Sequence, residues 1–397
     1  MIDTQNEKTK HIFTIIVLLQ LVLRSYGIKS LGGTFADYSL IVISIFVYTK
    51  QKRILTDRTA ELSYLPFLFY LIINFFLTFH TEFPVSDQII DWVRSILCYF
   101  IIIFGIKRYF DYEFGFKLYK YMSVIATIFL IIQYVAVVFG GYYISGFWGP
   151  FSLIDSLEMY RDYGLYSIST YRPNSFFTEP AHYATFIIPF FSINCFEKLN
   201  SKSILITIFL TFGILLSGST TGLVVCGICV VVWLFRFVKE TKNYKYIFIV
   251  VVFSVVAYSI VSDMDSFKFM LYRTFESDNA ANSRLRWFSG YTFPFEGMLG
   301  YLFGVGNCDL VLKRGQGWIP GWALLFQDYG IIGTIIYMGC SIFFWKKSTS
   351  KSRTIMILFW IVSIGAEVIV DQHMLYFLAF AIAENKQQKQ ERSAFQK

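Results

Sequence analysis

The residues best placed for chemistry lie in one short segment, Tyr171–Ala184. Proline suits the first position of a helix, and the residue before it has an extended backbone, so Pro180 predicts a helix start with Glu179 as its cap. A carboxylate there faces the positive end of the helix dipole, which favours its ionised form. Arg172 precedes Glu179 in a loop long enough to fold back onto it, and His182 follows on the first helical turn.

Two interpretations of this segment remain open at the level of sequence. In the first, Glu179 caps the helix and Arg172 is its structural partner at a membrane surface. In the second, Arg172 handles an anion beside Glu179, which acts as a carboxylate base. Both interpretations require the segment to stand at the end of a well-anchored helix.

The helices that position the segment are predicted from apolar runs. The chain is 55% hydrophobic and only 16% charged, whereas soluble domains carry about 25% charged residues. Its apolar runs approach the ~20 residues needed to cross the ~30 Å hydrocarbon core. Runs such as Ile247–Ile260 do not alternate as barrel strands would. We therefore predict an all-α, polytopic membrane bundle of about twelve transmembrane helices, at 11–27, 33–49, 62–80, 88–106, 119–140, 181–196, 203–217, 221–236, 245–262, 319–344, 354–371 and 373–384.

The distribution of charge predicts the topology of this single membrane domain, 1–397. Lys and Arg cluster in short segments between every second pair of apolar runs, which is the positive-inside pattern. Both termini are then cytoplasmic, and two large loops, 141–180 and 262–318, lie on the outer side. The net charge of +8 is explained by this pattern, so no nucleic-acid partner is expected.

The two outer loops are longer than a protein needs merely to span a bilayer. They are rich in aromatic residues and glycine, which argues against disorder. The stretch Ser283–Phe303 interleaves apolar and basic residues at roughly helical spacing, so it could lie flat on the membrane or cap the bundle. No set of His, Cys and carboxylate residues has metal-ligand spacing, and no glycine loop is built to hold phosphates, so no metal or cofactor is expected.

Four features resemble, in order along the chain, motifs of the O-antigen and capsule polysaccharide polymerases (Wzy type), which form a wider group with the O-antigen ligases. Arg172–Pro180 resembles the Arg-x-x-(Gly/Ser)-x-x-x-Glu-Pro signature before a membrane helix. Leu216–Gly222 resembles a Ser-rich hairpin between two helices. The other two features are an Arg…Trp…Phe-Gly-x-Gly stretch, at Asn282–Trp287 and Leu302–Asn307, and an acidic-x-Gly-x-x-Gly lead into a helix, at Leu325–Gly333, where Asp328 could start and cap the helix.

The chain also departs from the pattern of the group. The hairpin often carries an Arg where this chain has Thr220. Ligases are expected to carry a His about one helix length before Gly330, but Trp318–Trp322 fills that region without one. The departures disfavour a ligase that moves finished polymer to an acceptor and favour a polymerase.

The resemblance implies an enzyme of the bacterial cytoplasmic membrane that joins undecaprenyl-pyrophosphate-linked oligosaccharide repeat units at the outer face. The product would be capsule, O-antigen or another exopolysaccharide, and the partners would include the bilayer, a chain-length regulator and a flippase. Catalytic roles would fall to Glu179 as base and to Arg172 and Arg284, because Arg suits bidentate phosphate binding. Substrate-binding roles would fall to His182, Arg286, Trp287, Tyr291, Lys313 and Arg314.

Two further alternatives follow from the residues themselves. Trp287 and Tyr291 could stack on sugars, or they could belong to the aromatic belt of a membrane interface. A lipid-linked-oligosaccharide flippase would also have many helices, but transporters usually place polar groups at mid-membrane in repeated halves. Charged groups inside membrane segments are functional candidates by default, and Glu367, Asp371 and His373 are the cluster of this kind that we single out.

Overall fold

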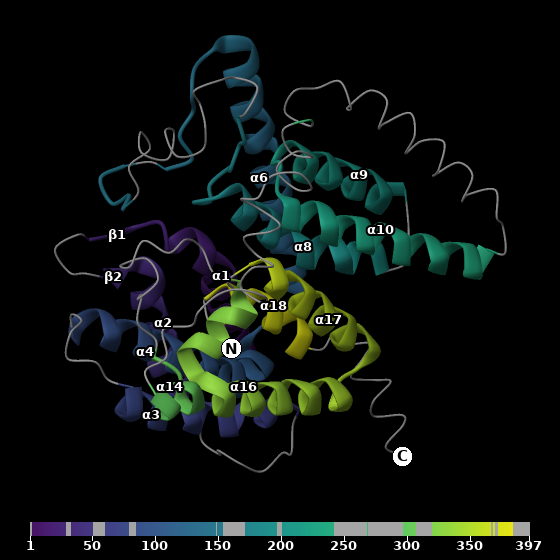
Figure 1. The fold of residues 1–397 in the computed structure, drawn as a ribbon. Coiled ribbons are helices and arrows are strands. Elements are labelled where there is room, and N and C mark those ends of the chain that lie inside the picture. Colours follow the sequence, from purple (N-terminus) through teal and green to yellow (C-terminus); the bar gives the residue numbers. More distant parts are fainter. Residues whose placement is uncertain are drawn as a thin grey trace. The chain divides into compact units, whose positions relative to one another are not determined.

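The computed structural model describes residues 2–28, 33–50, 60–78, 85–147, 149–153, 171–196, 201–241, 268, 297–306, 320–366, 368–369 and 372–383. These residues are mostly helical (Figure 1). The chain divides into two compact units: unit 1 is Met1–Tyr119 with Arg286–Lys397, and unit 2 is Lys120–Leu285.

Unit 1 contains most of the helices and a small antiparallel pair of strands in which Gly27 pairs with Thr34 and Ile28 with Gly33. Its elements are α1 (Ile2–Leu23), β1 (Gly27–Ile28), β2 (Gly33–Thr34), α2 (Phe35–Lys50), the 3-10 helix η2 (Ala60–Tyr64), α3 (Leu65–Thr78), α4 (Val85–Phe100), the π-helical turn η3 (Ile101–Gly105), α5 (Ile106–Tyr109), α14 (Gly297–Phe303), α16 (Gly321–Lys347), α17 (Ser350–Gly365) and α18 (His373–Ile382).

Unit 2 contains α8 (Pro180–Phe196), α9 (Ser201–Leu216) and α10 (Thr220–Thr241). The long helix α6 (Tyr112–Gly140) begins in unit 1 and contributes its remaining residues, from Lys120 onward, to unit 2.

Helices occupy eleven of the twelve predicted spans, and the other span, 245–262, lies outside the described residues. Among the residues that the structure describes, three helical stretches are long and apolar enough to cross a membrane: Gln88–Tyr109, Tyr112–Gly140 and Gly321–Lys347. In contrast, α18 has 10 residues, which at 1.5 Å per residue rise only ~15 Å, about half the hydrocarbon core. The helical fold is confirmed, whereas the number of membrane crossings stays a prediction.

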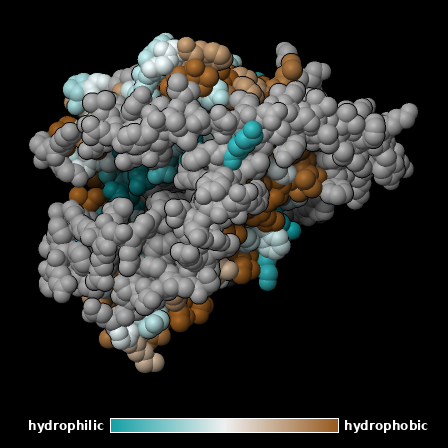
Figure 2. Space-filling view, turned by 45° about the horizontal axis from the view of Figure 1, so that its top comes forward, coloured by the Kyte–Doolittle hydropathy of each residue, from teal (hydrophilic) through white to brown (hydrophobic). Residues whose placement is uncertain are grey.

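Several described helices expose apolar side chains and bury polar ones in addition to their apolar core. On α6 the exposed residues from Tyr121 to Phe139 recur every three or four positions and are all aliphatic or aromatic: Tyr121, Ile125, Ile128, Ile132, Val135 and Phe139. The same helix buries Ser123, Thr127 and Gln133. Figure 2 shows apolar side chains, in brown, on the outside of the molecule. This arrangement suits a hydrocarbon surrounding rather than water.

The core of unit 1 is an aromatic cluster around Phe67. The ring of Phe67 lies 4.9 Å from that of Tyr99 and 5.2 Å from that of Tyr337, both edge-on. Tyr64 closes the cluster, and its hydroxyl hydrogen-bonds that of Ser341 at 3.2 Å. Edge-on aromatic pairs add to the area they bury, so α3, α4 and α16 are held together.

The centre of unit 2 is α8, which is buried along almost its whole length and packs with α9 and α10. Tyr183 is fully buried there, and its hydroxyl hydrogen-bonds Thr127 of α6 at 2.8 Å. A Cβ at Gly213 of α9 would lie 2.3 Å from that hydroxyl, so the glycine allows the helices to approach. A buried central helix gives its first turn, which carries the segment singled out by sequence, a rigid base.

Candidate functional site

The predicted helix start is confirmed: α8 begins at Pro180, and Glu179 is its cap. The carbonyl of Glu179 accepts hydrogen bonds from the backbone N–H groups of His182, at 3.0 Å, and Tyr183, at 3.2 Å. The side chain of Glu179 is half-buried, and it stands at the positive end of the helix. The half-buried side chain of Glu179 thus lies at the start of the buried helix.

The loop before the cap is fixed by a strained residue, Ser175, whose φ is +58°. Gln133 of α6 holds this residue at both backbone groups: its carboxamide oxygen accepts from Ser175 N–H at 2.7 Å, and its nitrogen donates to Ser175 carbonyl at 3.2 Å. The Ser175 hydroxyl donates to Ala126 carbonyl at 2.7 Å. A left-handed conformation at a non-glycine residue persists only where its surroundings enforce it, so this part of the loop is preorganised.

The segment that follows α6 packs on Ser175 as well. A Cβ at Gly146 would lie 1.9 Å from the carbonyl oxygen of Ser175, so only glycine allows the two chain segments to touch here. The rings of Tyr143 and Tyr171 meet edge-on at 6.4 Å, and burial raises the pKa of Tyr143, which keeps this phenol neutral. The two ends of the loop therefore form one packed base beside α8.

Arg172 lies against the Ser-rich hairpin between α9 and α10. A Cβ at Gly218, whose φ is +58°, would lie 3.2 Å from Nε and 3.4 Å from Cγ of Arg172. Ser219 caps α10, because its hydroxyl accepts from Gly222 N–H at 3.2 Å and its carbonyl from Leu223 N–H at 2.8 Å. The predicted hairpin is confirmed, and it is the surface on which the Arg172 side chain rests.

Arg172 was expected to fold back onto Glu179, but the two side chains do not pair. Among the residues that the structure describes, no ion pair joins Arg172 to Glu179. His182 faces its own helix start instead, where its Nδ1 makes a short hydrogen bond with the Thr178 hydroxyl. A direct ion pair between Arg172 and Glu179 therefore supports neither of the two interpretations of the segment.

The remaining residues predicted for the site lie outside the described ranges: Arg284, Arg286, Trp287, Tyr291, Lys313 and Arg314. Their roles stay predictions. The same holds for Glu367 and Asp371, and for the side chain of His373.

In unit 1 the structure joins the two other motifs, because a short strap, Phe303–Gly306, docks on α16. The N–H of Val305 donates to Gln327 carbonyl at 2.9 Å, and that of Gly306 donates to Asp328 carbonyl at 3.0 Å. These carbonyls are available because α16 is kinked at Gly330, with φ +62° and ψ −168°. The strap thus replaces hydrogen bonds that the kinked helix cannot make within itself.

Two side chains of α3 clamp the junction of strap and kink. The Asn74 amide donates to Phe303 carbonyl at 2.6 Å, and the Tyr70 hydroxyl donates to Tyr329 carbonyl at 2.6 Å. The predicted lead into a helix is confirmed in part. Asp328 does not open α16, which begins at Gly321, but it lies buried just before Gly330, where a kink divides α16 into two helical stretches. The acidic-x-Gly motif therefore ends one helical stretch and leads into the next.

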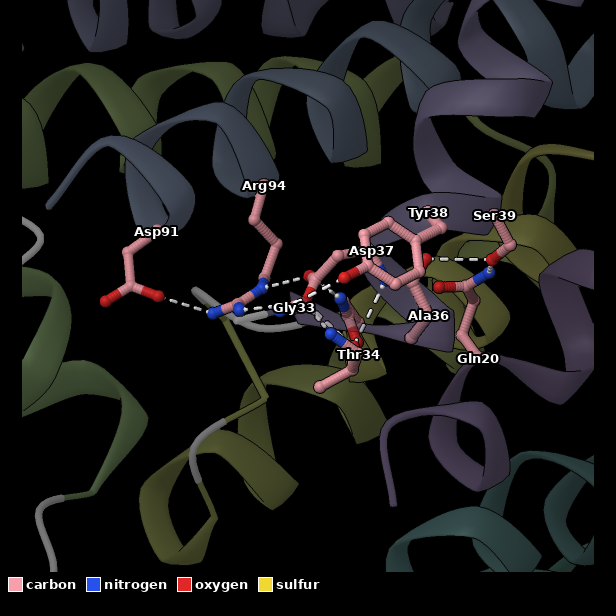
Figure 3. A network of polar contacts seen from close by, with 10 residues as sticks. Gln20, Gly33, Thr34, Ala36, Asp37, Tyr38, Ser39, Asp91 and Arg94 are labelled. Atoms are coloured by element: carbon pink, nitrogen blue, oxygen red, sulfur yellow. Dashed lines mark hydrogen bonds and ion pairs between the residues drawn. The ribbon is translucent and has the colours of Figure 1, made fainter. Parts of the chain in front are cut away.

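Sequence reasoning missed a charged network inside unit 1, shown in Figure 3. Arg94 of α4 binds Asp37 of α2 through Nε at 2.7 Å and Nη2 at 3.3 Å, and it binds Asp91 through Nη1 at 2.6 Å. Asp37 also accepts from the backbone and hydroxyl of Thr34 and from Gln372. The signal was present, because all three charged residues fall in predicted membrane spans, where charges are rare and costly.

The Asp37–Arg94–Asp91 network differs in character from the Arg172 segment. The Asp37 carboxylate receives a bidentate guanidinium and three further donors, which satisfies its oxygens and leaves it a structural role. It ties α2, α4 and the start of α18 together. The candidate for chemistry is therefore the segment from Arg172 to His182, and the network and the strap organise unit 1.

Within the described ranges, no group of three His, Cys, Asp or Glu side chains is placed to hold a metal ion. No known protein family matches the chain, and neither a curated protein nor a solved structure gives a significant match.

Proposed function

We propose that this chain is a polytopic enzyme of the bacterial cytoplasmic membrane that polymerises undecaprenyl-pyrophosphate-linked oligosaccharide units into surface polysaccharide. In this proposal both termini are cytoplasmic, the chain crosses the bilayer about twelve times, and Glu179 and Arg172 act at the outer face.

The observation that carries the proposal is the pairwise meeting of motifs that resemble those of the polymerases. Arg172 of the first motif rests on Gly218 of the hairpin motif. The strap, which ends the third motif, is hydrogen-bonded to the kink of the fourth. Motifs that resemble those of the polymerases only by chance would not be expected to contact one another, whereas parts of one catalytic site would. The outward-facing apolar residues support the membrane setting.

The chemistry needs few groups, because pyrophosphate is a good leaving group. The bond between the anomeric carbon of the growing chain and its pyrophosphate oxygen breaks, and the hydroxyl oxygen of the incoming unit bonds to that carbon. Glu179 takes the hydroxyl proton, and Arg172 neutralises charge on the released pyrophosphate. Arg284 would add a second cation in this scheme. The half-buried position of Glu179 at a helix start suits a base that must meet a hydrophilic acceptor.

The test is to incubate the purified, full-length protein in detergent with one lipid-pyrophosphate repeat unit and to resolve the products by gel. We expect a ladder of polymer lengths from the wild type. Glu179→Gln should lower the rate by about 100-fold or more, because a positioned general base contributes roughly 10²–10⁴. Arg172→Ala should lower it to a similar degree, since charge stabilisation by one donor is worth about 10²–10³.

A matched control is Glu113→Gln, which removes an exposed carboxylate from the first turn of another helix, α6, and should leave the ladder unchanged. Wild-type protein that yields no polymer, but moves finished polymer to an acceptor, would make it a ligase. Wild-type protein that carries the lipid-linked unit across vesicles without forming bonds would make it a transporter. Full activity in Glu179→Gln would remove Glu179 from the mechanism.

A further inference from the structure

The turn between α16 and α17 gathers basic side chains without acidic ones. Residues 329–366 contain Lys346, Lys347, Lys351 and Arg353 and no Asp or Glu. We call these four residues the basic turn. Lys346, Lys347 and Arg353 are exposed. No ion pair joins Lys346, Lys347 or Arg353 to a carboxylate that the structure describes. The described carboxylates therefore do not neutralise the charge of these three residues.

Three cations of the basic turn, Lys347, Lys351 and Arg353, are held in place by aromatic rings or by a helix end. Lys347 Nζ lies 4.1 Å from the centre of the Phe343 ring, and Arg353 Cζ lies 5.3 Å from that of Trp345. Arg353 also donates from Nε to Trp345 carbonyl at 3.0 Å and from Nη2 to Lys346 carbonyl at 2.8 Å, so it caps the end of α16. Lys351 hydrogen-bonds the Tyr112 hydroxyl and lies over its ring. These contacts reduce the freedom that Lys347, Lys351 and Arg353 would lose on binding an anion.

Each exposed cation stands one helical turn from an exposed apolar side chain. On α16, Lys346 follows Ile342 and Lys347 follows Phe343, each by four residues; on α17, Ile357 follows Arg353 by the same spacing. Ile342, Phe343 and Ile357 are 40%, 48% and 42% exposed. The apolar surface continues along α16 through Ile335 and Met338. Positive charge therefore borders apolar surface on both helices.

A free anion would contact only the cations of the basic turn, because it has no apolar part to cover Ile342, Phe343 and Ile357. An anionic phospholipid matches both halves, with phosphate at the cations and acyl chains along the apolar residues. Basic residues just outside a membrane helix attract anionic headgroups in this way. We propose that the basic turn binds the headgroup phosphate of an anionic phospholipid whose acyl chains lie along α16 and α17. The predicted topology puts this lipid in the cytoplasmic leaflet.

The test uses full-length protein in mild detergent with equal amounts of dioleoyl phosphatidylglycerol and dioleoyl phosphatidylcholine, and counts retained lipids by native mass spectrometry. We expect the wild type to retain phosphatidylglycerol preferentially. The double variant Lys346→Gln/Lys347→Gln should weaken that retention by about 25-fold, because each lysine near an anionic surface contributes about 1 kcal/mol. Arg353 is left intact because it also caps α16.

A control variant removes two exposed lysines elsewhere, Lys50→Gln/Lys117→Gln, so that both variants have the same net charge. It should retain phosphatidylglycerol as the wild type does. Equal retention of the two lipids by the wild type, or equal losses in the two variants, would overturn the proposal and leave the cations with a role in topology only. Displacement of the lipid by glycerol phosphate at matched concentration would also overturn it, because the site would then be one for a free anion. Elution on gel filtration checks that each variant is folded.

Discussion

Replacement of Gly304 by alanine should undock the strap from the kink of α16. Gly304 has φ +82°, and a Cβ there would lie 2.4 Å from both the carbonyl carbon and oxygen of Asp328. An alanine in the left-handed region costs about 1–2 kcal/mol. Since backbone atoms cannot give way as a side chain can, the strap must also move and lose its hydrogen bonds to the carbonyls of Gln327 and Asp328. At about 1 kcal/mol for each bond, the total loss of stability is about 3–4 kcal/mol.

The chain offers a matched control for the strain alone. Gly297 has φ +66°, and a Cβ there would meet nothing within 4 Å. Gly297→Ala should therefore cost only the conformational strain, about 1–2 kcal/mol. Equilibrium unfolding in mixed detergent micelles, followed by tryptophan fluorescence, measures both variants. The difference of about 2 kcal/mol between them isolates the docking of the strap.

A double-mutant cycle with Asn74→Ala tests the same contact from the other side. Asn74 donates to Phe303 carbonyl at 2.6 Å, so its removal from the wild type should cost about 1 kcal/mol. In the Gly304→Ala background the strap has already moved, and Asn74→Ala should cost little more. Equal losses in Gly304→Ala and Gly297→Ala, together with additive effects of Asn74→Ala, would refute the docking argument.

Two further substitutions test the other contacts. Gly218→Ala introduces both strain and a Cβ 3.2 Å from Arg172 Nε. The rate of polymerisation should therefore fall about tenfold or more, because a catalytic group is misplaced. Gly141→Ala is the control: Gly141 has φ +66° and open space around it, so this variant should keep full activity. Equal activities of the two variants would show that the hairpin does not position Arg172. Arg94→Met leaves Asp37 without its guanidinium partner and should lower the free energy of unfolding by about 2 kcal/mol. This is less than the ~3–5 kcal/mol lost when a fully buried pair is broken, because the side chains of Arg94 and Asp37 are 22% and 11% exposed. An unchanged unfolding midpoint in Arg94→Met would contradict the structural role of this network.

Local rules accounted well for individual elements. Pro180 and Glu179 mark the start of α8 as predicted, because a proline at the first helical position and a cap before it depend on neighbouring residues alone. The hairpin between α9 and α10 follows equally from Ser217, Gly218 and Ser219, which end one helix and cap the next. Apolar runs located the helices for the same reason, since burial in lipid or in a bundle acts on each segment separately.

Rules based on neighbouring residues failed where contacts with other parts of the chain change the geometry of a helix. The kink at Gly330 is stable because the strap and Tyr70 bind the carbonyls around it, and both come from distant parts of the chain. Asp328 was therefore predicted to open a helix, whereas it lies within α16, just before the kink at Gly330 that divides this element into two helical stretches. The Asp37–Arg94 pair was missed although the rule on charges in membrane segments applied to it, because that rule was used only for the cluster around Asp371.

The sequence by itself determined that the chain is helical and apolar, where most helices begin and end, and that Glu179 caps a helix beside a loop with Arg172. Those features depend on residues close together in the chain and on their transfer from water. Tertiary structure alone decided which of these parts meet: Arg172 packs on Gly218 rather than pairing with Glu179, and the strap docks on a kinked α16. Such contacts need two surfaces to match in shape. Gly218 faces the side chain of Arg172 and Gly304 faces the backbone of Asp328, and neither partner follows from the residues next to the glycine. The segment around Arg172 was therefore visible in the sequence, but its partner was not.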